Sequence, residues 1–215
     1  MIGALKYLFF GSLCNQLGYQ QLLLDGHLHP WTDLPVAILF YYLFLYFNFS
    51  GFCDVAIGLS GIAGVPVPEN FRTPFSARNA REFWTRWHIT LSEFMRDTVF
   101  TPLSKKLISW VGPKNANHAV GISIVVVFLL IGIWHGSGWN YAVFGLFHSI
   151  AVATVHYYDL WLKRKLGRTG YLAYQANLPI RAAATVLTFA FVATDLIFFA
   201  NSPAQLREIF HAIQW

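Results

Sequence analysis

The sequence predicts an all-α fold, a polytopic bundle of transmembrane helices, and three observations point to this class. Of the 215 residues, 56% are hydrophobic and only 12% are charged, which is about half of the charged fraction typical of soluble domains. Several apolar stretches approach or exceed the roughly 20 residues that a helix needs to cross a bilayer. No Pro/Gly/Ser-rich linker divides the chain, so we expect one membrane domain over residues 1–215.

The beginning of the chain predicts two membrane-associated helices joined by a turn. The apolar run from Met1 to Leu24 lacks an A-x-A cleavage site, and it is better interpreted as a membrane or interfacial helix than as a signal peptide. A turn is expected from His27 to Asp33, where Pro30 and polar residues interrupt the apolar pattern. From Leu34 to about Val65 the chain is long enough to span the bilayer.

Four polar side chains in this region are candidates for function. His27 and His29 form an H-x-H pair, but no third ligand lies nearby in the sequence, so no metal site is expected.

Asn48 and Asp54 are six residues apart, close to two helical turns, and both can face the same side of a helix. A carboxylate in the membrane requires a partner or a water-filled cavity. The pair either lines a tunnel or makes an interhelical hydrogen bond, and the sequence leaves both interpretations open.

The polar stretch from Pro66 to Asn117 contains eight basic and four acidic residues. Within it, Asn79 and Glu82 have the spacing of a capping box, which predicts that the helix REFWTRWHITLSEFMRD begins here. The amphipathic pattern is typical of a helix at the membrane interface, here on the cytoplasmic side.

On this predicted helix, Trp84, His88 and Leu91 would share one face, while Glu82 and Arg86 would pair at i, i+4 spacing. Taken alone, the pattern favours a packed His88 between the neighbouring tryptophans over a catalytic one.

Two predicted spans follow, His118–Trp134 and Trp139–Trp161, then a basic loop from Leu162 to Arg181 and a last span, Ala182–Ala200. Because two spans separate the two basic stretches, both stretches fall on one side of the membrane. They hold thirteen of the fifteen Lys and Arg residues, and the positive-inside rule makes that side cytoplasmic. The net charge of +5 therefore reflects the topology of a multi-pass protein of the cytoplasmic (inner) membrane and its anionic lipid head groups, and gives no case for a nucleic-acid partner.

His135 stands at the junction of two long apolar runs. Neither His118–Trp134 nor Trp139–His156 contains a Lys, Arg, Asp or Glu residue. An ionisable side chain at such a place is a functional-site hypothesis, because its burial in lipid is costly, and histidine titrates in the range that suits a general base or proton relay. A histidine that packs between helices or at the interface is the competing interpretation, and the spacing alone does not decide.

Four motifs, in chain order, resemble the membrane-bound O-acyltransferases: NFSGFCDVAIGL, PENFRTPF, AREFWTRWHITLSEFMRD and GIWHGSGWNYAVFGLFHS. The resemblance runs from about Tyr7 to the end of the chain. It is strongest to the bacterial branch that O-acetylates exopolysaccharides such as alginate, with the D-alanyl transferases of teichoic acid as near relatives. Family members are usually longer and have N-terminal helices without a counterpart here, so the resemblance implies the C-terminal portion of the family's fold.

The resemblance implies a bundle of tilted helices around a tunnel, which the acyl donor enters from the cytoplasm and the acceptor from outside. It implies catalytic roles for His135, in the WHG motif, and for His88, at the end of FWTRWH. Other motif positions imply substrate binding by Trp134, Asn48, Asp54, Arg86 and Trp87.

The implied activity moves an acetyl group from acetyl-CoA or an acyl-carrier thioester towards a hydroxyl of an extracytoplasmic polysaccharide, with no bound cofactor. A periplasmic or extracytoplasmic acetyltransferase partner is implied as well. A non-catalytic fragment or structural subunit of such a complex is the alternative. A transporter or membrane metal oxidase ranks last, because the eight histidines form no HxxxH or HxxHH box and no inverted repeat is apparent.

Overall fold

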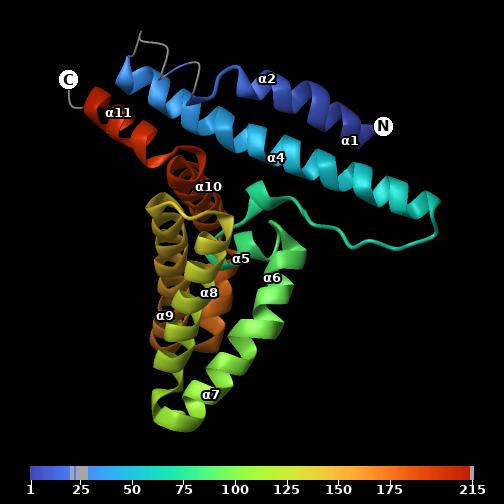
Figure 1. Ribbon diagram of the computed structural model, residues 1–215. Helices are drawn as coiled ribbons and strands as arrows, with labels where there is room; N and C mark the ends of the chain where they lie inside the picture. The colour runs from blue at the N-terminus through green and yellow to red at the C-terminus, as the bar shows by residue number, and fades with distance from the viewer. Residues whose placement is uncertain (20–21, 23–28, 214–215) are drawn as a thin grey trace. The chain divides into compact units, whose positions relative to one another are not determined.

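The computed structural model describes residues 1–19, 22 and 29–213, and within these it contains helices and no strand (Figure 1). The predicted all-α class is confirmed. The chain forms two compact units. Unit 1 comprises Met1–Phe71, Gly138–Asn140 and Val192–Trp215, and unit 2 comprises Arg72–Ser137 and Tyr141–Phe191. The single membrane domain expected from the sequence stays a prediction.

In unit 1 an N-terminal helical segment packs along the long helix α4, Pro30–Ile62 (Figure 1). The segment consists of α1, Ile2–Leu5, the π-helical η1, Lys6–Gly11, and α2, Ser12–Asn15. Over these residues the predicted N-terminal helix is confirmed.

Two glycines let the N-terminal segment approach α4 closely. A Cβ atom on Gly3 would lie 2.7 Å from the carbonyl oxygen of Gly51, and one on Gly51 would lie 2.7 Å from the carbonyl oxygen of Gly3. At this crossing Lys6 Nζ lies 2.7 Å from Asp54 Oδ2, and each side chain is more than two thirds buried. Asp54 thus has an ion-pair partner on the neighbouring helix, which is the kind of partner that a carboxylate in a membrane requires.

The other end of α4 packs against α11, Pro203–Ile213. The shared apolar core contains Tyr19, Ala37, Ile197, Leu206 and Ile209. Asn140, also in unit 1, is 2% exposed and its Nδ2 donates to the carbonyl oxygens of Phe198, at 3.0 Å, and Asn201, at 3.2 Å. These carbonyls lie at the C-terminal end of a helix, where they have no partner within the helix.

The predicted turn over His27–Asp33 is too long at its C-terminal end, because α4 already begins at Pro30. Proline is well suited to the first turn of a helix, and the Asp33 carboxylate accepts a hydrogen bond of 2.8 Å from the backbone N–H of His29. His27, and with it the H-x-H pair, lies outside the described residues.

Unit 2 contains short helices followed by a bundle (Figure 1). Its elements are η2 Pro74–Ser76, α5 Ala80–Trp84, α6 Ile89–Met95, η3 Arg96–Phe100, α7 Thr101–Val111, η4 Pro113–Asn115, α8 Ala116–His135, α9 Trp139–Ala176 and α10 Leu178–Ala200, the ends of α9 and α10 excepted, which belong to unit 1.

The basic loop predicted from Leu162 to Arg181 is wrong, since α9 continues to Ala176 with a kink at Gly167 and α10 begins at Leu178. Leu, Lys and Arg are good helix formers, so the sequence LKRKL does not end a helix. Gly167 has φ +65°, a conformation that glycine adopts without steric cost. The last span accordingly begins earlier than Ala182.

Among the described residues three helical stretches are long and apolar enough to cross a membrane: Trp31–Ile62, Pro113–His135 and Leu178–Ala200. They match three of the four predicted spans. The fourth, Trp139–Trp161, is helical but is not among the three. Its polar side chains lower its hydropathy, and they include the buried residues Asn140, His148 and Ser149.

The helices α8 and α9 run antiparallel and touch through glycine. A Cβ atom on Gly132 would lie 3.2 Å from Gly145 Cα and would collide with the carbonyl oxygen of Tyr141; one on Gly145 would collide with the carbonyl oxygen of Phe128. Backbones in such close contact leave no room for a methyl group.

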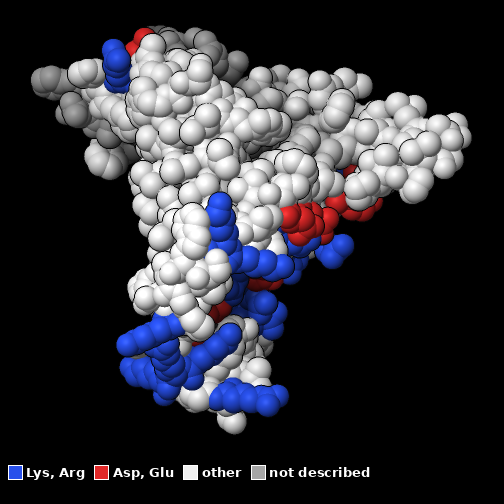
Figure 2. All heavy atoms as spheres, turned by 60° about the horizontal axis from the view of Figure 1, so that its bottom comes forward, with Lys and Arg blue, Asp and Glu red and all other residues white. Residues whose placement is uncertain are grey.

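The antiparallel arrangement brings the basic residues of α7 and η4 to the same end of unit 2 as those of α9. Figure 2 shows Lys and Arg side chains gathered there. The Lys and Arg residues of these three elements are Lys105, Lys106, Lys114, Lys163, Arg164, Lys165 and Arg168. This gathering agrees with two basic stretches on one side of a membrane, and the assignment of that side to the cytoplasm stays a prediction.

Candidate active site

The motif FWTRWH forms a helix end and a turn in place of the continuous helix predicted over REFWTRWHITLSEFMRD. The first helix, α5, ends at Trp84, and α6 begins at Ile89. Between them His88 has φ 47° and ψ 53°, the left-handed conformation, which costs a non-glycine residue about 1–3 kcal/mol. The predicted common face of Trp84, His88 and Leu91 is therefore wrong.

The break has a physical reason in the aromatic side chains. Both Trp84 and Trp87 are buried, with 8% and 7% of their surface exposed. The Trp87 ring stacks on Phe83 at 5.5 Å, and the backbone N–H of Arg72 donates to the carbonyl oxygen of Arg86 at 2.9 Å. Because the Arg86 carbonyl accepts this hydrogen bond from a segment distant in the sequence, the backbone is held in a turn directly before His88.

The predicted helix start at Asn79 is confirmed, since Asn79 Oδ1 accepts from the backbone N–H of Glu82 at 2.8 Å. The Glu82 carboxylate accepts from Arg78, whose backbone N–H lies at 3.0 Å and whose Nε lies at 2.9 Å. The predicted Glu82–Arg86 ion pair is also confirmed, at 2.8 Å. Burial acts to raise the pKa of Glu82, but the hydrogen bonds from the two arginines outweigh it and the pKa is lowered.

Arg86 holds the segment before α5 in place. Its Nη1 donates to Thr73 Oγ1 at 3.0 Å, to Ser76 Oγ at 3.2 Å and to the carbonyl oxygen of Arg72 at 3.4 Å. Its Nη2 donates to Glu82 Oε1 at 2.8 Å. With both terminal nitrogens engaged, Arg86 is positioned to stabilise the turn that carries Trp87 and His88.

His135 is the last residue of α8 and is partly buried. Its ring lies 4.8 Å from the ring of Trp134 and 6.3 Å from that of Phe144, both in edge-to-face orientation. Trp134 is 66% exposed. Unit 2 thus presents His135 beside an exposed indole at the end of a membrane-type helix.

His135 lies close enough to His88 for its charge to affect the pKa of His88. Burial lowers the pKa of His88, and positive charge on His135 lowers it further, to about 4. His88 is consequently neutral at neutral pH, with one ring nitrogen able to accept a proton. Two residues from separate motifs are therefore brought together in one compact unit.

The remaining predicted site residues divide between the units. Arg86, Trp87 and Trp134 belong to unit 2, as both histidines do, while Asn48 and Asp54 lie on α4 in unit 1.

Unit 2 also contains a buried histidine, His148, that the sequence analysis did not single out. His148 is 1% exposed, and its Nδ1 accepts a hydrogen bond of 3.2 Å from Trp84 Nε1. Aromatic rings surround it at centroid distances of 4.7–6.2 Å: Phe83, Trp84, Phe128, Phe144 and Phe191. Through this aromatic cluster α5 packs against α8, α9 and α10. Its one sequence signal is the i, i+4 pair of Phe144 and His148 in an uncharged run.

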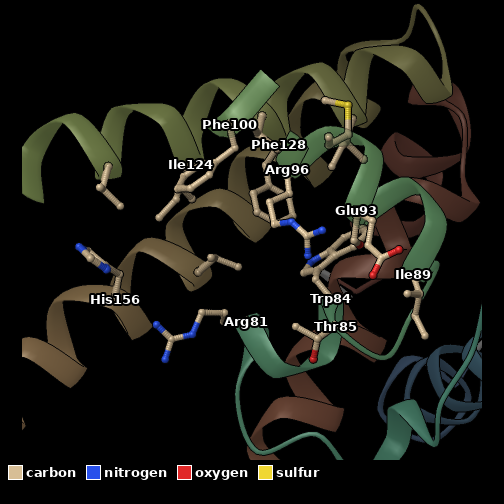
Figure 3. A pocket seen from close by; sticks show the side chains of 16 residues that line it. Arg81, Trp84, Thr85, Ile89, Glu93, Arg96, Phe100, Ile124, Phe128 and His156 are labelled. Atoms are coloured by element: carbon tan, nitrogen blue, oxygen red, sulfur yellow. The ribbon is translucent and has the colours of Figure 1, made fainter. Parts of the chain in front are cut away.

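Trp84 also lines a mainly apolar cavity of about 380 Å³ (Figure 3). Ile124 and Phe128 contribute to its apolar wall, His156 lies on one side and Glu93 on the opposite side (Figure 3). Neither His88 nor His135 is among the residues that line it. The histidine pair and this cavity are therefore separate features of unit 2.

Acidification from about pH 7 to about pH 4 is expected to destabilise the protein through His88. The pKa is 6.5 for an ordinary histidine and about 4 for His88 in the folded protein. In this window the unfolded chain binds the extra proton, so the free energy of unfolding falls as the pH falls. The midpoint of thermal unfolding in detergent should therefore drop less for His88→Gln than for the wild type. His118→Gln, at an exposed position of α8, is the control; equal pH dependence in all three proteins would contradict the prediction.

The fold and the site define an integral membrane protein of helices, in which two histidines from separate motifs belong to one compact unit and one of them ends a membrane-type helix. Residues 27–177 match the model of the membrane-bound O-acyltransferase family, and the chain belongs to this family. The family predicted from the four motifs is thereby confirmed.

Several curated proteins are similar to the chain. It is 34% identical over 167 residues to a teichoic acid D-alanyltransferase of Bacillus subtilis, covering 76% of this chain and 40% of the relative. It is 34% identical over 155 residues to a peptidoglycan O-acetyltransferase of Helicobacter pylori, covering 72% and 26%. A probable alginate O-acetylase AlgI of Azotobacter vinelandii is 36% identical over 121 residues, covering 56% and 23%.

The matched region spans less than half the length of each of these relatives. Their names specify three different acceptors, so alginate is one of several acceptor types among them.

Proposed function

We propose that this chain carries the acyl-transfer site of a membrane O-acyltransferase. The site moves an acetyl group from a cytoplasmic thioester, acetyl-CoA or an acyl-carrier thioester, towards a hydroxyl of an extracytoplasmic polysaccharide. One observation carries the proposal: His88 and His135, which come from separate motifs, belong to one compact unit and lie close enough for charge on His135 to lower the pKa of His88. Family membership supplies the reaction class.

The chemistry follows from the electrophilicity of a thioester. His135 accepts the proton of the attacking hydroxyl as general base while the oxygen forms a bond to the carbonyl carbon. The carbon–sulfur bond then breaks, and the thiolate leaves and takes up a proton. His88, kept neutral by burial, orients the substrate or relays this proton.

The other predicted residues support this chemistry in our proposal. Trp134 offers an exposed indole against which a substrate packs, and Trp87 and Arg86 fix the turn of His88. Asn48 and the ion-paired Asp54 lie on α4 in unit 1, and substrate binding by these two residues stays a prediction from the sequence motifs. An extracytoplasmic acetyltransferase partner receives the acetyl group on its way to the polysaccharide.

The proposed location is the cytoplasmic (inner) membrane, with several spans and the basic end of unit 2 in the cytoplasm. This orientation places anionic lipid head groups next to the gathered Lys and Arg residues (Figure 2).

The test is transfer of labelled acetyl groups from acetyl-CoA to polysaccharide in membranes that contain this chain. It is run with the chain alone and together with the products of neighbouring genes, and membranes without the chain are the control. Transfer that depends on the chain supports the proposal, and a requirement for a neighbour identifies the partner. Normal acetylation after removal of both histidines would instead show a non-catalytic subunit.

A further inference from the structure

A pocket rich in guanidinium groups lies between α5 and the beginning of α10. Its volume is about 690 Å³, and its wall includes Arg78, Arg86, Arg181 and a single carboxylate, Glu82. The other lining residues are small or apolar: Ser76, Leu178, Ala182, Thr185 and Val186. Three positive side chains thus face one negative side chain, which leaves two positive charges uncompensated.

Both oxygens of the Glu82 carboxylate accept hydrogen bonds from arginines. Glu82 Oε2 accepts from Arg78 Nε at 2.9 Å, and Oε1 accepts from Arg86 Nη2 at 2.8 Å and Arg78 Nη2 at 3.5 Å. Arg181 is exposed, and its guanidinium makes no hydrogen bond or ion pair with any residue that the structure describes. The positive charge of Arg181 is therefore available to a ligand.

Two of these arginines, Arg78 and Arg181, also border a second recess. Arg78 and Arg181 line a pocket of about 180 Å³ together with Tyr158, Tyr174 and Gln175. The hydroxyls of Tyr158 and Tyr174 lie 3.1 Å apart. A ligand whose anionic group lies at Arg78 and Arg181 could place further polar groups in the second recess, where Tyr158, Tyr174 and Gln175 offer hydrogen-bond partners.

We propose that Arg78 and Arg181 bind a phosphate group of the acyl donor, the phosphopantetheine phosphate that coenzyme A and carrier-bound thioesters share. Guanidinium groups suit this ligand because they bind phosphate oxygens through paired, charge-assisted hydrogen bonds. The proposal rests on the proposed function, which supplies the thioester donor. Arg86, whose terminal nitrogens are already engaged, positions Glu82 and does not touch the phosphate.

The test measures binding without catalysis. The purified full chain in an uncharged detergent is titrated by calorimetry with coenzyme A, with 4′-phosphopantetheine and with pantetheine, which has no phosphate. Arg181→Gln should weaken both phosphorylated probes about tenfold, the usual effect of losing one charge-assisted hydrogen bond. Arg181→Lys should restore part of the affinity, and pantetheine should bind weakly and equally to all variants.

Arg207→Gln, on α11 in unit 1, is the matched control and should bind coenzyme A as the wild type does. Equal affinity for coenzyme A and pantetheine, absence of measurable binding of any phosphorylated probe, or an Arg181→Gln affinity within about twofold of the control would overturn the proposal. Thermal unfolding of each variant is measured to check that the substitution at the exposed position leaves the fold intact.

A second arm separates the donor's phosphate from a lipid phosphate. The titration is repeated in nanodiscs of phosphatidylcholine and of phosphatidylcholine with phosphatidylglycerol. Loss of coenzyme A binding in the second, with Arg181-dependent binding of phosphatidylglycerol, would identify a lipid site and overturn the proposal. His135→Ala should bind coenzyme A normally, so failure of the proposed catalysis would leave Arg181-dependent binding measurable.

Discussion

Replacement of His135 by alanine is expected to lower the rate of acetyl transfer by about 10²- to 10⁴-fold, the range that general-base catalysis contributes. The side chain sits at the last residue of a helix that is long and apolar enough to cross a membrane. Initial rates are measured with labelled acetyl-CoA in membranes matched for the amount of chain.

His118→Ala is the matched control for this prediction. His118 lies near the other end of the same helix and is exposed, so its removal should leave the rate unchanged. Transfer at the wild-type rate by His135→Ala would show that another group takes the proton. An equal loss in both variants would point to a general effect on α8.

Substitution of Gly145 by alanine is expected to destabilise unit 2 by about 1–3 kcal/mol, the usual cost of overpacking. The new methyl group would collide with the carbonyl oxygen of Phe128, on the facing helix. Gly132→Ala should behave similarly, since its methyl group meets the carbonyl oxygen of Tyr141. The measurement is the midpoint of thermal unfolding in detergent, together with the yield of folded protein.

Gly58→Ala provides the control, because, apart from its own stretch of helix, no described residue has an atom within 4 Å of the position of a Cβ at Gly58. In a helix this change should be neutral or stabilising by about 0.5–1 kcal/mol. If Gly145→Ala and Gly58→Ala unfolded at the same temperature, the close contact of α8 and α9 would not be a determinant of stability.

The fold class could be predicted because it depends on composition and on the lengths of apolar runs, which are local properties. The helix start at Asn79 and the Glu82–Arg86 pair could be predicted for the same reason, since both are contacts within one turn or two. Three of the predicted spans correspond to long apolar helices.

The break at His88 could not be predicted, because its causes are distant in the sequence. Burial of Trp84 and Trp87 and the backbone bond from Arg72 outweigh the helical preference of the segment. The role of His148 was missed for a related reason. Its hydrogen bond from Trp84 joins positions far apart in the chain, and only the folded unit brings them together.

In the proposed mechanism His88 and His135 act as one unit in acyl transfer. A double-mutant cycle tests it directly, with rates of labelled acetyl transfer for the wild type, His88→Ala, His135→Ala and the double variant. Residues that act together give strongly non-additive losses. We predict that the double variant transfers acetyl about as slowly as His135→Ala alone. Losses that multiply independently would show that the two histidines act separately, and wild-type transfer by the double variant would show that neither takes part in the reaction.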